Sequence, residues 1–216
     1  MKKAVVFDLD GTLTDTIASI KISADKAVGK YGFGPFSEEQ YKYFVGDGAA
    51  TLIERCLEAG GDKEQKYFEG AFKEYQKVFE EYCMYKVEPY AGIRELLAAL
   101  KERGIRLAVL SNKPHERTKE VICTIFGDEC FDEVRGQMDG VPKKPSPEGV
   151  FKILEELSLN AEDILYMGDT GTDMQTGKSA GAFTIGALWG FRQKEELIEN
   201  GADAIIENPL QLIDYL

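Results

Sequence analysis

The stretch VVFDLDGT, residues 5–12, carries two carboxylates two positions apart, directly after an apolar run and before a glycine. An apolar run of this kind is typical of a buried strand, and buried positions rarely hold a charge without a partner. Alternate residues of an extended segment point to the same side, so Asp8 and Asp10 are expected to share one face. The pair therefore indicates a functional site at the end of the first strand.

The second half of the chain predicts a parallel sheet. After Pro89, predicted helices over residues 93–103, 115–126, 147–157 and 172–180 alternate with predicted strands over residues 106–110, 133–136, 164–167, 183–185 and 204–206. A terminal helix follows the last strand. Repeated alternation of this kind predicts an α/β fold, a doubly wound parallel sheet with helices on both faces.

A helical region interrupts this series. Residues 15–85 show the apolar spacing of helices, over residues 15–30, 41–44, 49–57 and 65–84, and no convincing strand. We therefore predict a Rossmann-like catalytic core, residues 1–14 and 86–216, and an all-helical cap, residues 15–85, inserted after the first strand. Hinges are expected near residues 14–16 and 87–91.

The composition argues against several classes of partner. The formal net charge of −12 opposes binding to nucleic acids and anionic membranes, because both need lysine and arginine against phosphate. No stretch approaches the ~18 apolar residues of a membrane span, and the strand that follows Met1-Lys2-Lys3 leaves no room for a signal peptide. The four cysteines form no CxxC motif and are expected to stay reduced. We expect a cytoplasmic protein, monomeric or homodimeric, that acts on a small molecule.

The ends of the later strands bring further polar residues to the same edge. Ligands of an open parallel sheet bind beyond the carboxyl ends of its strands. Ser111-Asn112 follow one strand, Asp169 and then Asp173 follow another, and Lys144 stands before the intervening helix. A cluster of carboxylates repels itself without a cation, and Mg²⁺ prefers oxygen ligands and joins carboxylates to phosphates. The edge is therefore expected to bind magnesium and a phosphate group.

The residue types suit phosphoryl transfer. Asp8 is placed to attack phosphorus and form an aspartyl-phosphate, while Asp10 gives a proton to the leaving oxygen and later takes one from water. Ser111 and Lys144 are donors for phosphate oxygens. Gly11 permits a tight turn after the two aspartates, and the hydroxyl of Thr12 is expected to hold Asp10 in orientation.

Four motifs in order, DLDGT at 8–12, SN at 111–112, KP at 144–145 and GDTGTD at 168–173, resemble those of the haloacid dehalogenase superfamily of hydrolases. The resemblance implies a doubly wound core with a helical cap and a magnesium-dependent phosphatase. It implies Asp8 as nucleophile, Asp10 as acid and base, and Ser111 and Lys144 on the phosphoryl group. Magnesium would lie on Asp8, Asp169 and the backbone carbonyl of Asp10, with Asp173 as a direct or indirect acidic partner.

Two further phrases, FVGDGAATLIERCL at 44–57 and ALWGFR at 187–192, are similar to phosphoglycolate phosphatases within that superfamily. The resemblance implies that the cap residues Gly46, Asp47, Gly48 and Arg55 contact the substrate. Where the branch usually has GNGA this chain has GDGA, which adds a negative charge near the expected anionic substrate. A turn between two helices is the simpler interpretation of the glycines, and a solvated side chain that of Arg55.

Other functions on the same fold stay open. A pyrophosphatase or a broad sugar-phosphate phosphatase would carry the same motifs. A sugar phosphomutase of the family usually has a cap histidine where this chain has Ile20, and a true dehalogenase lacks the second aspartate. A phosphate-sensing binding protein would lack the nucleophile or the acid and base. The phrase GTDMQTGKS at 171–179 is not a Walker A loop, because five residues separate its glycines where four are needed.

Overall fold

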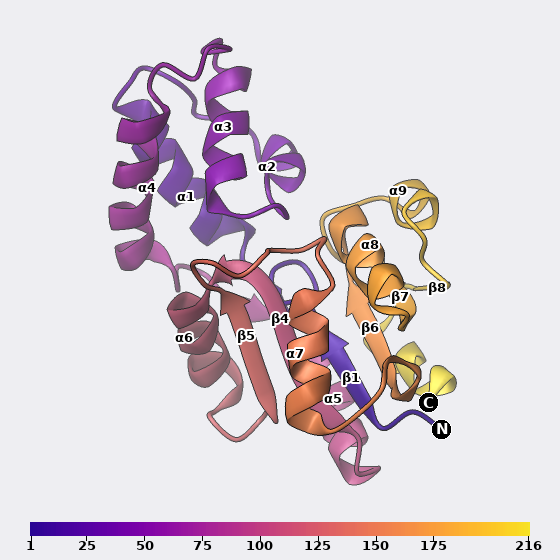
Figure 1. Cartoon of the computed structure of the whole chain (residues 1–216). Coiled ribbons are helices and arrows are strands. Elements are labelled where there is room, and N and C mark those ends of the chain that lie inside the picture. Colours follow the sequence, from indigo (N-terminus) through magenta and orange to yellow (C-terminus); the bar gives the residue numbers. More distant parts are fainter. The chain divides into compact units, whose positions relative to one another are not determined.

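The computed structural model describes residues 1–216 and divides into two compact units. The first, called the core unit here, contains Met1–Asp15 and Pro89–Leu216, and the second, the cap unit, contains Thr16–Glu88. Both are drawn in Figure 1.

The core unit is built on a six-stranded sheet in the order β5-β4-β1-β6-β7-β8, and every neighbouring pair is parallel. The strands are β1 (Ala4–Phe7), β4 (Arg106–Pro114), β5 (Glu133–Gln137), β6 (Ile164–Gly168), β7 (Phe183–Ala187) and β8 (Ala204–Ile206). The chain leaves β1 for β4 and β5 on one side and later returns to β6 on the other. The switch point of this doubly wound sheet therefore lies at the carboxyl end of β1.

Helices cover both faces of the sheet, as the predicted fold class requires. They are α5 (Ile93–Glu102), α6 (His115–Phe126), α7 (Glu148–Leu157), α8 (Gly171–Ala180) and α9 (Lys194–Glu199), with 3₁₀ turns η1 (Ala161–Asp163) and η2 (Pro209–Tyr215). Figure 1 shows α7 in front of the sheet and α5 behind it. On the α7 face, Val6, Ala108 and Tyr166 of three adjacent strands form a buried cluster with Val150 and Ile153 of α7. All four residues of β1 are buried, which explains its uninterrupted apolar sequence.

The cap unit contains the four helices α1 (Ile17–Gly29), α2 (Glu38–Phe44), α3 (Ala49–Ala59) and α4 (Phe68–Tyr82). Their shared interior holds the fully buried side chains of Tyr41, Ile53 and Leu57. Tyr75 and Phe79, four positions apart on α4, are buried with their rings stacked at a centroid distance of 5.3 Å. The aromatic spacing of this region therefore serves packing between helices, as the sequence predicts.

Several boundaries differ from those predicted. Helix α1 begins at Ile17, because Thr14–Asp15 forms the short strand β2, which pairs with β3 (Glu88–Pro89). The six-residue helix α9 is missing from the prediction, since KEELIE buries only Leu197 and shows no apolar periodicity. The terminal segment is a 3₁₀ helix. Strand β4 continues four residues past Leu110, through an irregular register against β5.

None of the helices combines the length and the apolar content that crossing a membrane requires. The four cysteines are all free thiols, as expected from their spacing.

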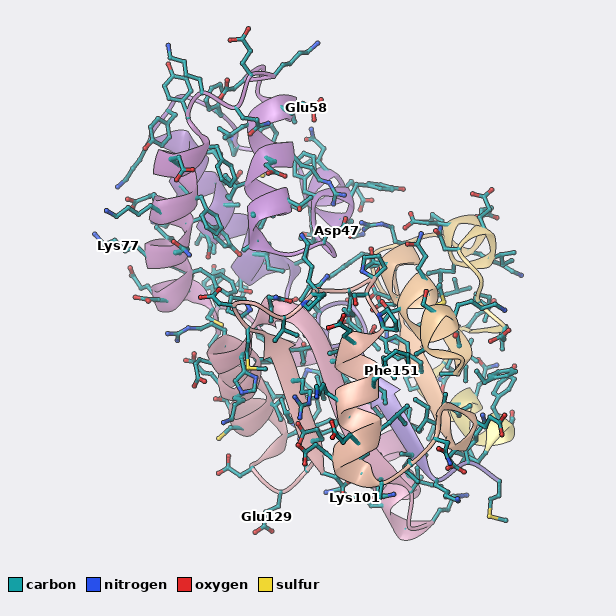
Figure 2. The ribbon with its side chains drawn as sticks, viewed as in Figure 1. Asp47, Glu58, Lys77, Lys101, Glu129 and Phe151 are labelled. Carbon is teal, nitrogen blue, oxygen red and sulfur yellow. The ribbon has the colours of Figure 1, made fainter.

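Substitutions on α7 test the packing of the core unit. Ile153 is fully buried, whereas Phe151 on the same helix, labelled in Figure 2, is 47% exposed. Ile153→Ala should lower the free energy of unfolding by about 2–4 kcal/mol, because it leaves a cavity against the sheet. Phe151→Ala is the matched control and should change it by less than about 1 kcal/mol. Urea unfolding measures both, and equal losses would contradict this assignment of the buried face.

Candidate active site

The predicted core residues of the site meet at the switch point of the sheet. Asp8 follows β1 directly, and its backbone N–H donates to the carbonyl of Met167 in β6 at 2.8 Å. Phe7 pairs in register with Val109 of β4 and Met167 of β6, so the end of β1 lies between β4 and the end of β6. Ser111 lies past Val109, and Asp169 lies past Met167. The structure therefore brings together residues that are more than 150 positions apart in the chain.

Lys144 is a buried cation between two of the aspartates. Its Nζ lies 2.6 Å from Asp8 Oδ1 and 2.6 Å from Asp173 Oδ1. Burial raises the pKa of Asp8 well above its ordinary value, the charge of Asp173 adds to this rise, and Lys144 opposes it. Burial lowers the pKa of Lys144, but the charges of Asp173 and Asp8 outweigh burial and raise it well above its usual range. Lys144 is therefore a firmly charged ammonium group.

Asp173 is surrounded by protein donors. Its Oδ1 accepts from Lys144 at 2.6 Å and from the Tyr166 hydroxyl at 3.3 Å, and its Oδ2 accepts from Thr170 N–H at 3.1 Å and Thr170 Oγ1 at 2.7 Å. The bonds with Thr170 form a capping box at the start of α8. Tyr166 and Thr170 are absent from the predicted site. In this arrangement Asp173 holds the ammonium group of Lys144 in place through an ion pair.

Asp169 is held by two donors from separate segments. Thr12 Oγ1 donates to its Oδ1 at 3.0 Å, and the backbone N–H of Phe191 donates to its Oδ2 at 2.8 Å. Burial raises the pKa of Asp169 to about 7, and the charge of Asp173 adds to the rise, while the two donors oppose it. The expected contact from Thr12 to Asp10 is therefore wrong. The tight turn at Gly11 brings the Thr12 hydroxyl to Asp169.

Asp10 has a different partner, Lys113. The two side chains form an ion pair in which Lys113 is 3% exposed and Asp10 is 18% exposed. Sequence reasoning missed this lysine, because a lysine followed by a proline at the start of a helix is usually solvated. The sequence feature that could have indicated it is the position of Lys113 directly after Ser111-Asn112, where β4 continues beyond its predicted end.

Asn112 contacts the chain around Lys144. Its Nδ2 donates to the carbonyl of Lys144 at 3.1 Å, and its Oδ1 accepts from the N–H of Lys144 at 2.9 Å. This pair of hydrogen bonds fixes the backbone of Lys144 to the end of β4. The predicted substrate contact of Asn112 would have to coexist with this structural use of its amide. Ser111 Oγ, buried beside it, accepts from the N–H of Lys113 at 3.1 Å.

A segment after β7 closes tightly on the DLDGT turn. Trp189 Nε1 donates to the carbonyl of Thr12 at 2.9 Å, two residues before the Phe191 N–H that binds Asp169. A Cβ atom on the intervening Gly190 would lie 2.4 Å from Asp169 Oδ2 and 2.4 Å from the carbonyl oxygen of Gly11. Only glycine permits this approach. The ALWGFR phrase therefore supports the acidic cluster from the side.

The net negative charge of the site suits a divalent cation. Oxygen atoms of Asp8, Asp169 and Asp173 all lie within 4.8 Å of one another, and all three residues are buried. When all are ionised, these three carboxylates and that of Asp10 exceed the ammonium groups of Lys113 and Lys144 by two negative charges. Burial is the main cause of the raised pKa values of Asp8 and Asp169, and the negative charge of Asp173 adds to both. Hard oxygen donors with this net charge fit a cation such as Mg²⁺ or Mn²⁺.

The predicted cap residues form a loop of their own. Gly46 and Gly48, with φ of 111° and 89°, flank Asp47 just before α3, and Asp47 is labelled in Figure 2. Arg55 pairs with the Asp47 carboxylate and donates to the carbonyl of Phe44 at 3.0 Å. Arg55 therefore stabilises this loop and offsets the charge that Asp47 adds. The loop belongs to the cap unit.

The Gly11 turn can be tested against a control of similar backbone conformation. Gly11 has φ of 94°, and a Cβ there would lie 2.3 Å from Asp169 Oδ2, whereas Gly104 has φ of 70° and open space around it. Gly104→Ala should reduce the free energy of unfolding by about 1 kcal/mol through backbone strain alone. Gly11→Ala should reduce it by about 1–3 kcal/mol more, because the methyl group also collides with a buried side chain. Urea unfolding decides, and equal losses would contradict the close approach.

Known proteins match the chain along nearly its whole length. It is 34% identical to a phosphoglycolate phosphatase of Aquifex aeolicus strain VF5, over 99% of this chain and 96% of that one. It is 31% identical to an N-acetylmuramic acid 6-phosphate phosphatase of Pseudomonas aeruginosa, over 99% and 94% of the two chains. Its fold is similar to the crystal structure of a predicted phosphoglycolate phosphatase from Lactobacillus delbrueckii subsp. bulgaricus, with a TM-score of 0.93, 29% identity and coverage of 100% and 98%.

The model of one family matches residues 5–187, a range that contains the paired aspartates, Lys144 and the GDTGTD motif. The sheet order, the helical cap unit and these motifs agree with that match. The chain therefore belongs to the haloacid dehalogenase-like hydrolases and resembles their phosphoglycolate phosphatase branch, as its sequence predicts.

Proposed function

We propose that this protein is a magnesium-dependent phosphatase that hydrolyses a small phosphate monoester through an aspartyl-phosphate on Asp8. The observation that carries the proposal is the Asp8–Lys144 pair at the switch point of the sheet, with a second aspartate two residues away. The names of the two relatives described above support phosphate monoesters as the substrate class.

Asp8 is the nucleophile in this proposal. One carboxylate oxygen of Asp8 attacks phosphorus, an acyl phosphate bond forms, and the bond from phosphorus to the substrate oxygen breaks. Lys144, paired with Asp8 at 2.6 Å, orients the carboxylate and offers N–H donors to the phosphoryl oxygens. Ser111, at the end of the neighbouring strand, is a further donor. Asp173 holds Lys144 in place from its other side.

Asp10 moves the protons. It gives a proton to the leaving alkoxide in the first step, so that an alcohol departs. In the second step it takes a proton from water, whose oxygen attacks phosphorus and releases inorganic phosphate and the free Asp8 carboxylate. Its carboxylate is more exposed than that of Asp8, which suits a group that meets both an alcohol and water.

Asp8, Asp169 and the backbone carbonyl of Asp10 would hold Mg²⁺. The excess of two negative charges and the spacing of the carboxylates support this assignment. When bound, the cation neutralises charge on the phosphoryl group and on the cluster. Thr12 and Phe191 orient Asp169 toward the cluster through the two hydrogen bonds described above.

The substrate class follows from the relatives' names. Phosphoglycolate and N-acetylmuramic acid 6-phosphate are both phosphate monoesters of an alcohol that carries a carboxylate. We propose phosphoglycolate as the first candidate and N-acetylmuramic acid 6-phosphate as the second. Arg55 offsets the negative charge of Asp47 in the cap loop, so this pair adds no net negative charge that would repel an anionic substrate.

We also propose that the cap unit closes over the substrate, excludes water and chooses the leaving group. Hinges near residues 14–16 and 87–91 would permit this movement. The two boundaries between the compact units support the proposal. The boundary at Asp15/Thr16 lies within the first range, and that at Glu88/Pro89 lies within the second.

Substitution of the two aspartates tests the mechanism. Asp8→Asn should lower kcat by about 10⁴-fold or more, because the amide is a poor nucleophile. Asp10→Asn should lower it by about 10²–10⁴-fold through loss of proton transfer. Asp139→Asn, an exposed position in the core unit, is the matched control and should keep full activity. Circular dichroism checks that the variants fold. Near wild-type hydrolysis by a folded Asp8→Asn protein would contradict the assignment of the nucleophile.

A panel of phosphate esters tests the substrate class. Phosphoglycolate is compared with 2-hydroxyethyl phosphate, and N-acetylmuramic acid 6-phosphate with N-acetylglucosamine 6-phosphate. In each pair the first compound carries a carboxylate and the second has none. Pyrophosphate, pentose phosphates and nucleoside monophosphates complete the panel. We expect release of phosphate with magnesium, none with excess chelator, and a higher kcat/KM for the carboxylate-bearing member of a pair. Equal rates within both pairs would overturn the substrate class, and undiminished activity in chelator would overturn the metal.

A further inference from the structure

Lys113 is a buried cation that no part of the mechanism above uses. Its side chain is 3% exposed and forms an ion pair with Asp10 Oδ1. It lies in the last part of β4, between Ser111 and the start of α6. A lysine is almost never this buried unless it has a partner, and Asp10 is a partner of Lys113.

The backbone around Lys113 is fixed on both sides. Its N–H donates to Ser111 Oγ at 3.1 Å, and its carbonyl accepts from Thr118 Oγ1 at 3.1 Å. Strand β5 also passes very close, since a Cβ on Gly136 would lie 2.7 Å from the carbonyl oxygen of Lys113. The register of β4 against β5 is irregular between Leu110 and Pro114, at the position of this lysine. The backbone that carries the Lys113 side chain is therefore held in place.

The two aspartates of the DLDGT motif are held by different lysines. Lys144 pairs with Asp8 and is shared with Asp173, whereas Lys113 pairs with Asp10. Asp10 is the more exposed of the two aspartates, and a carboxylate with access to water rotates freely unless a partner restrains it. Proton transfer needs the carboxylate within hydrogen-bond reach of the leaving oxygen. A restraint on Asp10 is therefore a requirement of the mechanism.

We propose that Lys113 is a positioning residue that holds the Asp10 carboxylate toward the leaving oxygen during proton transfer. The proposal rests on the function proposed above. Lys113 acts through Asp10 and not by binding the phosphoryl group. Removal of the Lys113 ammonium group should therefore lower the rate most for substrates whose leaving group needs a proton.

Lys113→Met tests this proposal, because methionine keeps the apolar stem and removes the ammonium group. Two substrates are compared by kcat/KM, which reports the steps up to release of the alcohol: the preferred alkyl phosphate of the panel and p-nitrophenyl phosphate. The nitrophenolate departs without a proton, whereas the alkoxide needs one. We expect a loss of about 10- to 100-fold for the alkyl ester and a much smaller loss for the aryl ester. Lys119→Met, at an exposed position on α6, is the matched control and should change neither.

Two further measurements separate positioning from other roles. In the Asp10→Asn background, Lys113→Met should cause no additional loss with the alkyl ester, because the group through which it acts is already missing. Inhibition by inorganic phosphate should be unchanged. Lys113→Gln, which keeps a hydrogen-bond donor, should retain more activity than Lys113→Met and serves if the methionine variant does not fold.

Equal losses for both substrates, an additional loss in the Asp10→Asn background, or weaker phosphate inhibition would each overturn the role of Lys113. Those results leave the proposed phosphatase intact, because the wild-type protein remains active in them. A wild-type protein that hydrolyses neither substrate would overturn the proposed function and this inference together.

Discussion

The structure depends on one constraint, the concentration of four carboxylates at a buried edge of a parallel sheet. Burial and mutual repulsion oppose ionisation of these groups, as the raised pKa values of Asp8 and Asp169 show. Two buried lysines and several hydrogen-bond donors compensate for part of that repulsion, and the remaining negative charge fits a divalent cation. The compensating groups come from different segments of the chain, so the site forms only when the fold brings these segments together. A sheet that switches direction at β1 is one solution, because it brings the ends of three strands to one place.

The same constraint explains the glycines around the cluster. A Cβ at Gly11 or at Gly190 would collide with Asp169, and a Cβ at Gly168 would lie 2.3 Å from atoms of Asp173. The backbone therefore approaches the carboxylates closely enough for its N–H groups to bind them, as Phe191 does. This close contact leaves the acidic side chains few alternative orientations. The rigidity of the site thus comes from backbone that only glycine permits.

The sequence was sufficient to predict the sheet, the helical cap unit and the residues that meet at the edge. The predicted strands are followed by Asp8, Ser111 and Asp169, and they carry that information locally, because the carboxyl ends of parallel strands share an edge. The partners within the edge could not be predicted, since a contact such as Thr12 to Asp169 depends on a turn with φ of 94° at Gly11. Lys113 was missed for a related reason: an irregular register of β4 decides that it is buried. The residues that contact substrate from the cap unit stay predictions.

In the proposed mechanism, Asp8 carries the phosphoryl group during turnover. The most direct test is a rapid acid quench of the wild-type protein mixed with magnesium and its preferred substrate labelled with ³²P, followed by mapping of the labelled peptide. Acyl phosphates survive brief exposure to acid, so the intermediate can be captured. We expect label on the peptide that contains Asp8, and this label should appear before free phosphate and disappear in a chase with unlabelled substrate. Release of phosphate in every turnover with no label on the protein, or with label on another residue, would contradict this mechanism.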